Sequence, residues 1–454
     1  MDKKIQKEKI NVDDYNMKKM AIMSIPIFIE LFLQLLVGNV DQIMISHYSE
    51  NAVAAIGNGN QIMSILIMFL NVMGSGTTIV LARYLGANNK KKVAETSTVA
   101  LAMLTVLGFI ASFILVVFHM PIFRLMNVPE EILADASKYM SVIGMCVIVH
   151  SIYIAFGAIL RSYSMNSTIT LISFIMNILN VIGNAILIYG FFGMPKLGIL
   201  GVAISTNVSK CIGLIIMVVI FKKKLGIKLS LSYLSPLPTE TIRKILAVAI
   251  PSGAEGISYN ISQMVVLGVI NTFGTYVVNT KVYVGMAATI AYIYSVAIAQ
   301  ALQVVIGYIV GAGRKELVGK KVWSVQLVAT VAAVGLSILL YFVSDVFIGL
   351  FTSDERVLAL AHQVLLVEIF LEIGRSINIV MVKALIAVGD VKFPVACGIT
   401  CQWVVAALFS YIIGSVMGLG LVGVWIALAL DECIRGFIYI IRFKRGKWKT
   451  IKTL

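Results

Sequence analysis

Residues 98–118 read TVALAMLTVLGFIASFILVVF, a run of 21 residues without a charged side chain. An α-helix rises about 1.5 Å per residue, so this run is long enough to cross the roughly 30 Å hydrocarbon core of a bilayer. A chain in that core must pair its own backbone groups, which only helices and closed β-barrels do, and barrel strands are about half as long. The run therefore indicates a transmembrane helix.

The rest of the 454-residue chain has the same character, with 59% hydrophobic and 13% charged residues and a mean hydropathy of +0.95. Soluble domains are roughly half apolar and a quarter charged. We predict an all-α polytopic membrane protein with twelve transmembrane helices, whose apolar runs are centred near Leu33, Ser64, Leu107, Ile148, Leu179, Ser209, Ser258, Ser295, Val331, Leu371, Ala406 and Leu430.

The net charge of +15 would suggest nucleic-acid binding in a soluble chain. In a membrane protein the distribution of Lys and Arg reports orientation, because these residues collect in cytoplasmic loops. With the N-terminus inside, inner segments hold 28 of the 37 basic residues, outer segments hold 5, and 4 lie within spans. We therefore predict a multi-pass plasma-membrane protein with both termini cytoplasmic and no nucleic-acid partner.

An internal repeat relates the two halves of the chain at an offset of 225 residues, pairing Pro26 with Pro251, Glu30 with Glu255, Gly86 with Gly311, Val93 with Val318 and Leu160 with Leu385. Because six spans bring the chain back to the same side, the repeat is parallel, and it predicts two six-helix lobes, 1–225 and 226–454. Each proline is expected about one turn into the first helix of its lobe, where it starts the helix or permits a bend. Parallel duplication is typical of secondary transporters.

Polar side chains inside the predicted spans are functional candidates, because burying them in lipid is costly. Asp41 is expected in the outer half of the first helix, and Asn180 and Asn184 share a face of the fifth. Thr206 is expected near the outer end of the sixth helix, so all four reach one depth. A carboxylate, two amides and a hydroxyl suit a small hard cation or a titrating carboxyl. The alternative is that they only bridge helices.

Opposite charges at similar depth are expected to pair. Glu30 and Lys210 both fall near the midplane, where they form a buried pair or, alternatively, Glu30 contacts a cationic substrate when Lys210 moves away. In the second half we predict an ion-paired charge network that includes Glu255, Glu368, Glu372 and Arg375. Further internal pairs are predicted on the last helix, from the spacing of Asp431, Glu432 and Arg435.

Short motifs along essentially the whole chain carry a family resemblance: RYLGA at 83–87, LNVIGN at 179–184, GILGVAIST at 198–206, GYIVGAG at 307–313, ALIAVGD at 384–390, GLVGV at 420–424 and RFKRGKW at 442–448. In order and spacing they resemble the multidrug and toxic compound extrusion (MATE) family. The resemblance implies a V-shaped twelve-helix fold of two lobes that exports cationic or amphiphilic organic compounds in exchange for protons or sodium ions. The expected partners are small organic cations and membrane lipids. We expect a monomer without a cofactor other than the coupling ion.

The resemblance also assigns roles to residues. The N-lobe cation site of the family matches Asp41, Asn180, Asn184 and Thr206, with sodium as a candidate ion at the first three. Asn184 stands where many members have a second Asp, which lowers the charge of the site and favours proton coupling through Asp41. In the second lobe Asn260 and Arg375 stand where coupling acids would be expected. We therefore predict that coupling rests on the N-lobe.

Two other functions are alternatives to export. A flippase for a lipid-linked precursor, built on a related fold, would favour a strongly basic cavity, and few cations lie within the predicted spans. A membrane-embedded enzyme would need a catalytic constellation, and the sequence contains no HExxH and no nucleophile elbow. We predict that the protein is not an enzyme.

Overall fold

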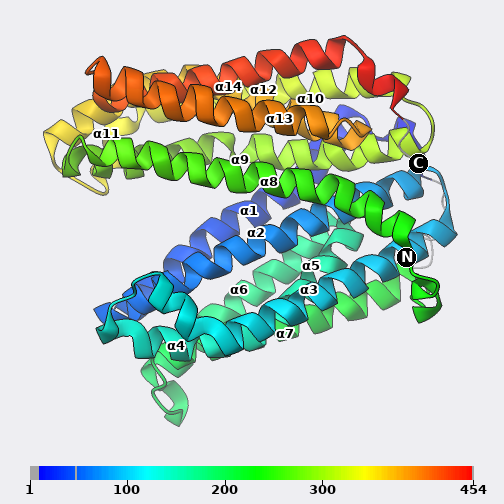
Figure 1. Ribbon diagram of the computed structural model, residues 1–454, viewed down its shortest axis with the longest axis horizontal. Coiled ribbons are helices and arrows are strands. Elements are labelled where there is room, and N and C mark those ends of the chain that lie inside the picture. The colour runs from blue at the N-terminus through cyan, green and yellow to red at the C-terminus, as the bar shows by residue number, and fades with distance from the viewer. Residues whose placement is uncertain (1–9, 47–48, 452–454) are drawn as a thin grey trace. The chain divides into compact units, whose positions relative to one another are not determined.

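The computed structural model describes residues 10–46 and 49–451, apart from the side chains of residues 36–43 and 50. The described residues form helices and no β-strand (Figure 1). The principal helices are α1 (Met17–Ser46), α2 (Glu50–Gly86), α3 (Lys90–Leu125), α4 (Glu130–Met145), α5 (Val147–Ser162), α6 (Asn166–Tyr189), α7 (Ile199–Ile220), α8 (Thr239–Asn271), α9 (Thr275–Gly311), α10 (Glu316–Phe342), α12 (Glu355–Val388), α13 (Lys392–Cys401) and α14 (Gly420–Lys444). Shorter pieces are η1 (Val12–Asp14), η2 (Phe191–Gly193), η3 (Phe221–Leu225), η4 (Leu231–Leu234), α11 (Ser344–Gly349), η5 (Gln402–Ala407), η6 (Ser410–Val416) and η7 (Lys447–Thr450).

Each of the twelve predicted spans coincides with one of these helices or with a broken pair, which confirms the all-α membrane fold. Within the described residues, eight helices are long and apolar enough to cross a bilayer, and α4 with α5 makes a ninth, bent by 44°. Helices α1, α8 and α14 complete the twelve predicted spans, but they are not among the helices that meet these criteria of length and apolar character. The eleventh span continues from α13 through the π-helical turns η5 and η6.

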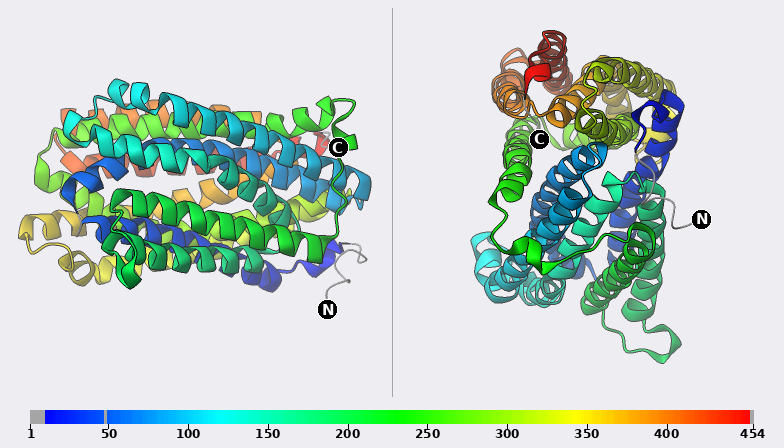
Figure 2. Two further views of the ribbon diagram at one scale, coloured as in Figure 1. Left: turned by 90° about the horizontal axis from the view of Figure 1, so that it is seen from below. Right: turned by 90° about the vertical axis from the view of Figure 1, so that its right-hand side faces the viewer.

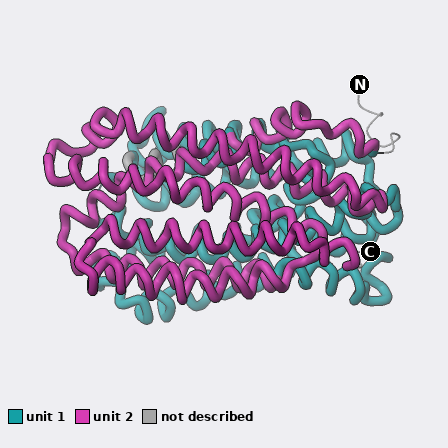
Figure 3. Tube along the Cα trace, turned by 90° about the horizontal axis from the view of Figure 1, so that it is seen from above, with its two compact units in different colours: residues 1–10, 29–249 teal, residues 11–28, 250–454 magenta. Residues whose placement is uncertain are grey.

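Two compact units are distinguished by their internal packing. Unit 1 contains residues 1–10 and 29–249, and unit 2 contains residues 11–28 and 250–454 (Figure 3). Helix α1 thus begins in unit 2 and continues in unit 1, whereas α8 begins in unit 1 and continues in unit 2.

The two prolines of the repeat lie inside these shared helices. Pro26 is inside α1 and Pro251 is inside α8, so the expectation of a position one turn from each helix start is wrong. The helices begin earlier because their charged first turns continue the same helix. A proline inside a helix removes one backbone hydrogen bond. Pro26 and Pro251 do so within three residues of the positions at which α1 and α8 change from one unit to the other.

Unit 1 packs α2, α3 and α5 against one another and pairs α6 with α7. Its core contains fully buried apolar side chains such as Leu81, Ile159 and Leu160. In unit 2, α12 is the central helix and contacts α9, α10 and α14. Because α12 is surrounded, polar side chains along its middle are enclosed by protein rather than lipid. Within each unit, taken by itself, the long helices run roughly side by side (Figure 2).

Candidate functional site

A polar cluster in unit 1 joins α6 to α7. The amide Nδ2 of Asn180 donates a hydrogen bond to Oγ1 of Thr206 at 3.1 Å. The hydroxyl of Ser205 donates to the backbone carbonyl of Asn180 at 2.8 Å. Asn180 and Asn184 are 5% and 0% exposed. The structure therefore brings together Asn180 and Thr206, as the sequence predicted, and buries Asn184 one turn further along α6.

Gly183 lets the two helices approach at this point. A Cβ added to Gly183 would lie 2.4 Å from Oγ of Ser205 and 3.1 Å from its Cβ. Any side chain here would push α6 away from α7, so the glycine is required for the Asn180–Thr206 contact. The close packing of the two helices is a consequence of this small residue in the LNVIGN stretch.

Two contacts tether α1 to the rest of unit 1. Oε1 of Glu30 accepts a hydrogen bond and ion pair from Nη2 of Arg161 on α5 at 2.7 Å. Further along α1, the hydroxyl of Tyr189, at the end of α6, donates to the carbonyl of Met44 at 2.8 Å. Asp41 lies between these tethers, about one turn before Met44, and its side chain is outside the described residues.

The partner of Glu30 corrects the predicted pair with Lys210. Glu30 is buried, with 4% of its surface exposed, and Arg161 in the last turn of α5 neutralises it. Sequence analysis did not find this partner, because an arginine at a helix end cannot be distinguished by local sequence from one in a loop. Lys210 instead lines a cavity of about 100 Å³ within unit 1, together with Asn60, Tyr139 and Thr206.

The side-chain oxygen of Asn180 is the chemically distinctive atom of the cluster. Oδ1 is buried and has no hydrogen-bond partner among the described residues. Leaving a buried acceptor unsatisfied costs about 1–3 kcal/mol, so this oxygen is a ready acceptor for a protonated carboxyl or a ligand for a cation. The adjoining cavity reaches Thr206, which gives water a place beside the cluster.

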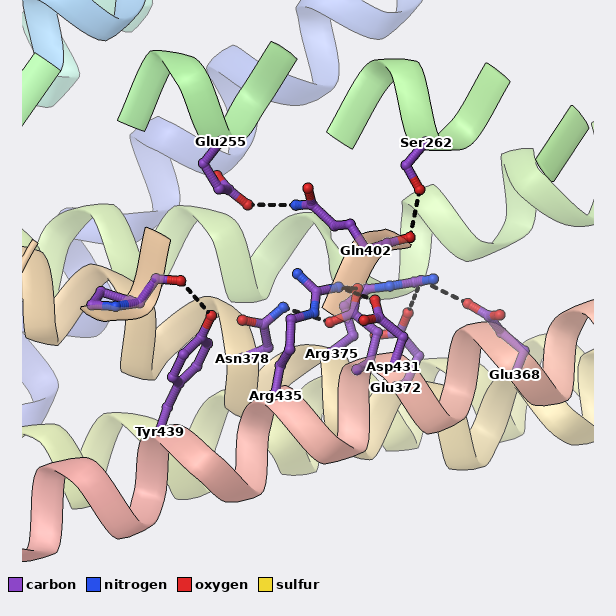
Figure 4. Close-up of polar contacts among 12 residues, drawn as sticks. Glu255, Ser262, Glu368, Glu372, Arg375, Asn378, Gln402, Asp431, Arg435 and Tyr439 are labelled. Atoms are coloured by element: carbon purple, nitrogen blue, oxygen red, sulfur yellow. Dashed lines mark hydrogen bonds and ion pairs between the residues drawn. The ribbon is translucent and has the colours of Figure 1, made fainter. Parts of the chain in front are cut away.

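In unit 2, Arg375 organises a charge network on α12 (Figure 4). Its Nη1 contacts Oε1 of Glu368 at 2.8 Å and also contacts Oε1 of Glu372. The second oxygen of Glu368 accepts a hydrogen bond from the indole Nε1 of Trp425 on α14 at 2.7 Å. The predicted grouping of these two acids with Arg375 is therefore present, and both acids are buried.

A second part of the network lies on α14. Arg435 pairs with Asp431, and its Nη2 lies 3.1 Å from Oε1 of Glu432, which are the internal pairs predicted from spacing. Nδ2 of Asn378 on α12 donates to the other oxygen of Glu432 at 2.6 Å. Residues of α12 and α14 thus share one set of charge-assisted hydrogen bonds. Among the side chains that the structure describes, which leave out those of residues 36–43 and 50, no cluster of three or more metal-binding groups occurs.

Glu255 on α8 is held by an amide rather than by Arg375. Nε2 of Gln402, in η5, donates to Oε1 of Glu255 at 2.8 Å. The backbone carbonyl of Gln402 accepts from the hydroxyl of Ser262 at 2.7 Å, which anchors η5 to α8 (Figure 4). Sequence reasoning did not find Gln402, Trp425 or Asn378, because neutral hydrogen-bonding partners carry no charge signal in an apolar run.

Comparison with known proteins gives consistent matches over the whole chain. The profile of the MatE family matches residues 26–186 and 251–412. The sequence is 34% identical over 423 residues to the uncharacterized transporter YisQ of Bacillus subtilis, covering 93% of each chain. It is 24% identical to the probable multidrug resistance protein NorM of Thermotoga maritima, covering 95% of this chain and 93% of that relative.

Solved structures agree in fold. An outward-facing multidrug resistance MATE transporter of the MOP superfamily superposes with a TM-score of 0.89 at 20% identity, covering 98% of this chain and 100% of that one. A MOP superfamily transporter from Pyrococcus furiosus, described as having a binding pocket of reverse polarity, superposes with a TM-score of 0.87 at 20% identity over 99% of both chains. At this identity the likeness bears on the fold alone.

Proposed function

The chain belongs to the MatE family of multidrug and toxic compound extrusion transporters, and from this premise we propose that it exports cationic or amphiphilic organic compounds in exchange for protons. Relatives named as probable multidrug resistance proteins support the substrate class. Sodium is the alternative coupling ion. We further propose that the protein works as a monomer in the plasma membrane with both termini cytoplasmic, as its distribution of Lys and Arg favours.

The observation that carries the coupling proposal is the orphaned Oδ1 of Asn180 beside a doubly tethered α1. The tether at Met44 brings α1 to the end of α6, and Asp41 precedes Met44 by three residues, about 4.5 Å along a helix. Asn184 precedes Tyr189, the other end of that tether, by five residues. This register supports a site in which the Asp41 carboxyl meets the amides of α6.

The composition of the site favours a proton over sodium. Hard cations are held by several oxygen ligands, and their affinity rises with the number of carboxylates. The amides and the hydroxyl offered by Asn180, Asn184 and Thr206 carry no charge, so Asp41 alone compensates a bound sodium ion. A proton on Asp41 needs only one acceptor for the resulting O–H, and Oδ1 of Asn180 can supply it.

Coupling requires that the proton binds two conformational states unequally, since a ligand with equal affinity for both states shifts nothing. Helix α1 can transmit such a difference, because residues 17–28 pack in unit 2 and residues 29–46 in unit 1. Protonation of Asp41 would change how α1 bonds to α6. The effect would then pass along α1 through Pro26 to the segment in unit 2.

The flippase alternative would require uncompensated cations for phosphate groups. Three arginines inside the helices instead have acidic partners: Arg161 pairs with Glu30, Arg375 with Glu368 and Glu372, and Arg435 with Asp431 and Glu432. This neutralisation supports export of cationic compounds over transfer of anionic headgroups.

The proposal is tested by dye efflux from proteoliposomes that contain the purified native chain. A proton gradient and a sodium gradient are imposed separately, and release of a lipophilic cationic dye is followed by fluorescence. We expect efflux with the proton gradient and only leakage with the sodium gradient. Empty liposomes provide the leakage control. If neither gradient moves any of a panel of lipophilic cations, the export assignment is wrong.

A further inference from the structure

The segment that joins α7 to α8 is strongly basic. Lys222, Lys223, Lys224 and Lys228 fall within seven residues, and no acidic residue occurs from 221 to 239. None of these four lysines forms an ion pair within the described part of the chain, although salt bridges occur nearby between Lys92 and Glu95 and between Lys244 and Glu240. The joining segment therefore carries four positive charges that the protein does not neutralise.

An apolar groove lies directly beside this basic segment. It has a volume of about 430 Å³ and runs between α3 and η4 in unit 1. Leu101 and Thr105 of α3 line one side, and Leu229, Leu231 and Leu234 line the other. Lys228 immediately precedes the first of these leucines. An apolar groove is thus contiguous along the chain with an uncompensated cationic group.

The mouth of the groove is rimmed by exposed apolar side chains. Leu231 is 81% exposed and Val106, on the α3 side, is 57% exposed. Leu237, further along the joining segment, is also exposed. Side chains of this kind are stable where hydrocarbon covers them, because exposing apolar surface to water costs roughly 25 cal/mol per Å². Helix α3 is itself long and apolar enough to span the bilayer, so its outer face meets acyl chains.

We propose that the groove and the four lysines of the joining segment form a binding site for one anionic phospholipid. An acyl chain lies in the groove between α3 and η4, and the phosphate of the headgroup contacts the lysines. Basic side chains at the membrane surface each attract anionic lipid, and long lysine stems reach the headgroup level while their carbons stay in the apolar layer. An acyl chain accounts for the exposed leucines, and a negative headgroup accounts for the unpaired charge.

Occupancy would tie the joining segment to α3. Apart from its basic end, this segment is attached through partly buried Ile227 and Leu234, which pack against the core of unit 1. A lipid in the groove adds apolar contacts on both sides and a charge-assisted contact at Lys228. The residues that line the groove do not include Asn180 or Thr206, and lipid binding can be measured without transport.

The first test measures lipid selectivity. The delipidated full-length chain in neutral detergent is titrated with phosphatidylglycerol and with phosphatidylcholine of the same acyl chains, and bound lipid is counted by native mass spectrometry. We expect phosphatidylglycerol to bind about tenfold more tightly to the native chain. The preference should fall to within about twofold when all four lysines of the joining segment are replaced by glutamine.

A matched control removes the same charge elsewhere, by replacing four exposed lysines of unit 2 with glutamine: Lys18, Lys320, Lys392 and Lys447. This control should keep the native selectivity. If the two quadruple variants behave alike, the preference reflects net charge and the proposed site is wrong. Thermal unfolding midpoints, measured for both, verify that each variant is folded.

The second test fills the groove. Thr105→Trp should weaken binding of both lipids about tenfold, because the indole occupies the place of the acyl chain. Ile114→Trp, on an exposed position of the same helix two to three turns away, should leave binding unchanged. In a last experiment, soluble glycerol phosphate is added as a competitor, to test whether the headgroup alone is sufficient for binding. If it competes with phosphatidylglycerol at equal concentration, or if Thr105→Trp binds as the native chain does, the lipid site is refuted.

Discussion

The two units carry different side chains at polar positions that the internal repeat makes equivalent. At the offset of 225 residues, Thr206 and Lys210 of α7 correspond to Asp431 and Arg435 of α14. In unit 1 the first of these positions joins a neutral hydrogen bond with Asn180. In unit 2 the same two positions form an ion pair with each other. Helices α7 and α14 thus share polar positions, but the charges of the side chains at these positions differ.

Orphaned oxygen atoms occur in both units, but their surroundings differ. In unit 2 they include Oε2 of Glu372 and Oδ1 of Asp431, and in each case the other carboxylate oxygen already contacts an arginine. In unit 1 they include Oε2 of Glu30, whose other oxygen likewise contacts an arginine, and Oδ1 of the neutral Asn180. Oε1 of Gln402 is a comparable neutral orphan in unit 2. The comparison indicates that unit 2 uses its charges to hold α12 against α14. For unit 1, we propose that the orphaned oxygen of Asn180 accepts an ion or the proton of a carboxyl group.

The largest expected effect concerns the charge network of unit 2. Arg375→Met would leave Glu368 and Glu372 buried without their cation, and breaking a buried pair in this way costs about 3–5 kcal/mol. Arg356→Met is the control, because its pair with Asp354 is exposed to solvent and contributes little to stability. Unfolding free energies in detergent measure both. Equal, small losses would show that the unit 2 network is not structural.

The helix contact of unit 1 gives the next effect. Gly183→Ala forces α6 away from α7, and overpacking of this kind costs about 1–3 kcal/mol. Dye efflux should fall with it, and the double variant Gly183→Ala with Ser205→Gly should recover both. Gly157→Ala is the control, because a Cβ there meets nothing within 4 Å. Native efflux in Gly183→Ala would mean that the Asn180–Thr206 contact is unimportant.

Asn184→Asp sharpens the comparison by giving unit 1 a second acid. A second carboxylate should raise the apparent affinity for sodium on the order of tenfold, since cation affinity follows the charge of the ligands. The sodium gradient should then drive efflux that it does not drive in the native chain. Asn260→Asp adds the same charge to α8, in unit 2, and should leave the ion preference unchanged. The reverse pattern would move the ion site to unit 2.

The smallest expected effect is the loss of one hydroxyl. Thr206→Val removes the acceptor for Nδ2 of Asn180, and the loss of one hydrogen bond costs about 1 kcal/mol. Efflux should fall several-fold, with its pH dependence shifted. Thr280→Val in unit 2 removes a hydroxyl that bonds only within its own helix turn, and its pH profile should match the native one. Identical profiles for the two variants would make Thr206 a packing residue.

Sequence alone predicted the spans well, because hydropathy is a property of about twenty residues at a time. It also predicted contacts within one helix, such as Arg375 with Glu368 and Arg435 with Asp431, since helical spacing fixes them. Contacts between helices were less predictable. The depth estimate placed Glu30 beside Lys210, whereas the rotation of α1 turns Glu30 toward Arg161, and depth contains no information on rotation.

Where the units divide could not be predicted from the repeat. The repeat joins near residue 225, but packing assigns residues 226–249 to unit 1 and residues 11–28 to unit 2. Helices α1 and α8 pass between the units because their interiors are continuous through Pro26 and Pro251. Neutral partners such as Gln402 were missed for a related reason. When a single amide side chain occurs in an apolar run, the local sequence does not show whether it hydrogen-bonds to a functional residue or only fills space.

The central claim is that coupling depends on Asp41 in unit 1 and not on the acids of unit 2. Its most direct test compares proton-driven dye efflux from proteoliposomes containing equal amounts of folded Asp41→Asn and Glu255→Gln. Dye binding without a gradient shows that each variant still takes substrate. We predict that Asp41→Asn abolishes gradient-driven efflux while Glu255→Gln retains most of it. Loss of efflux in Glu255→Gln together with native efflux in Asp41→Asn would contradict the claim.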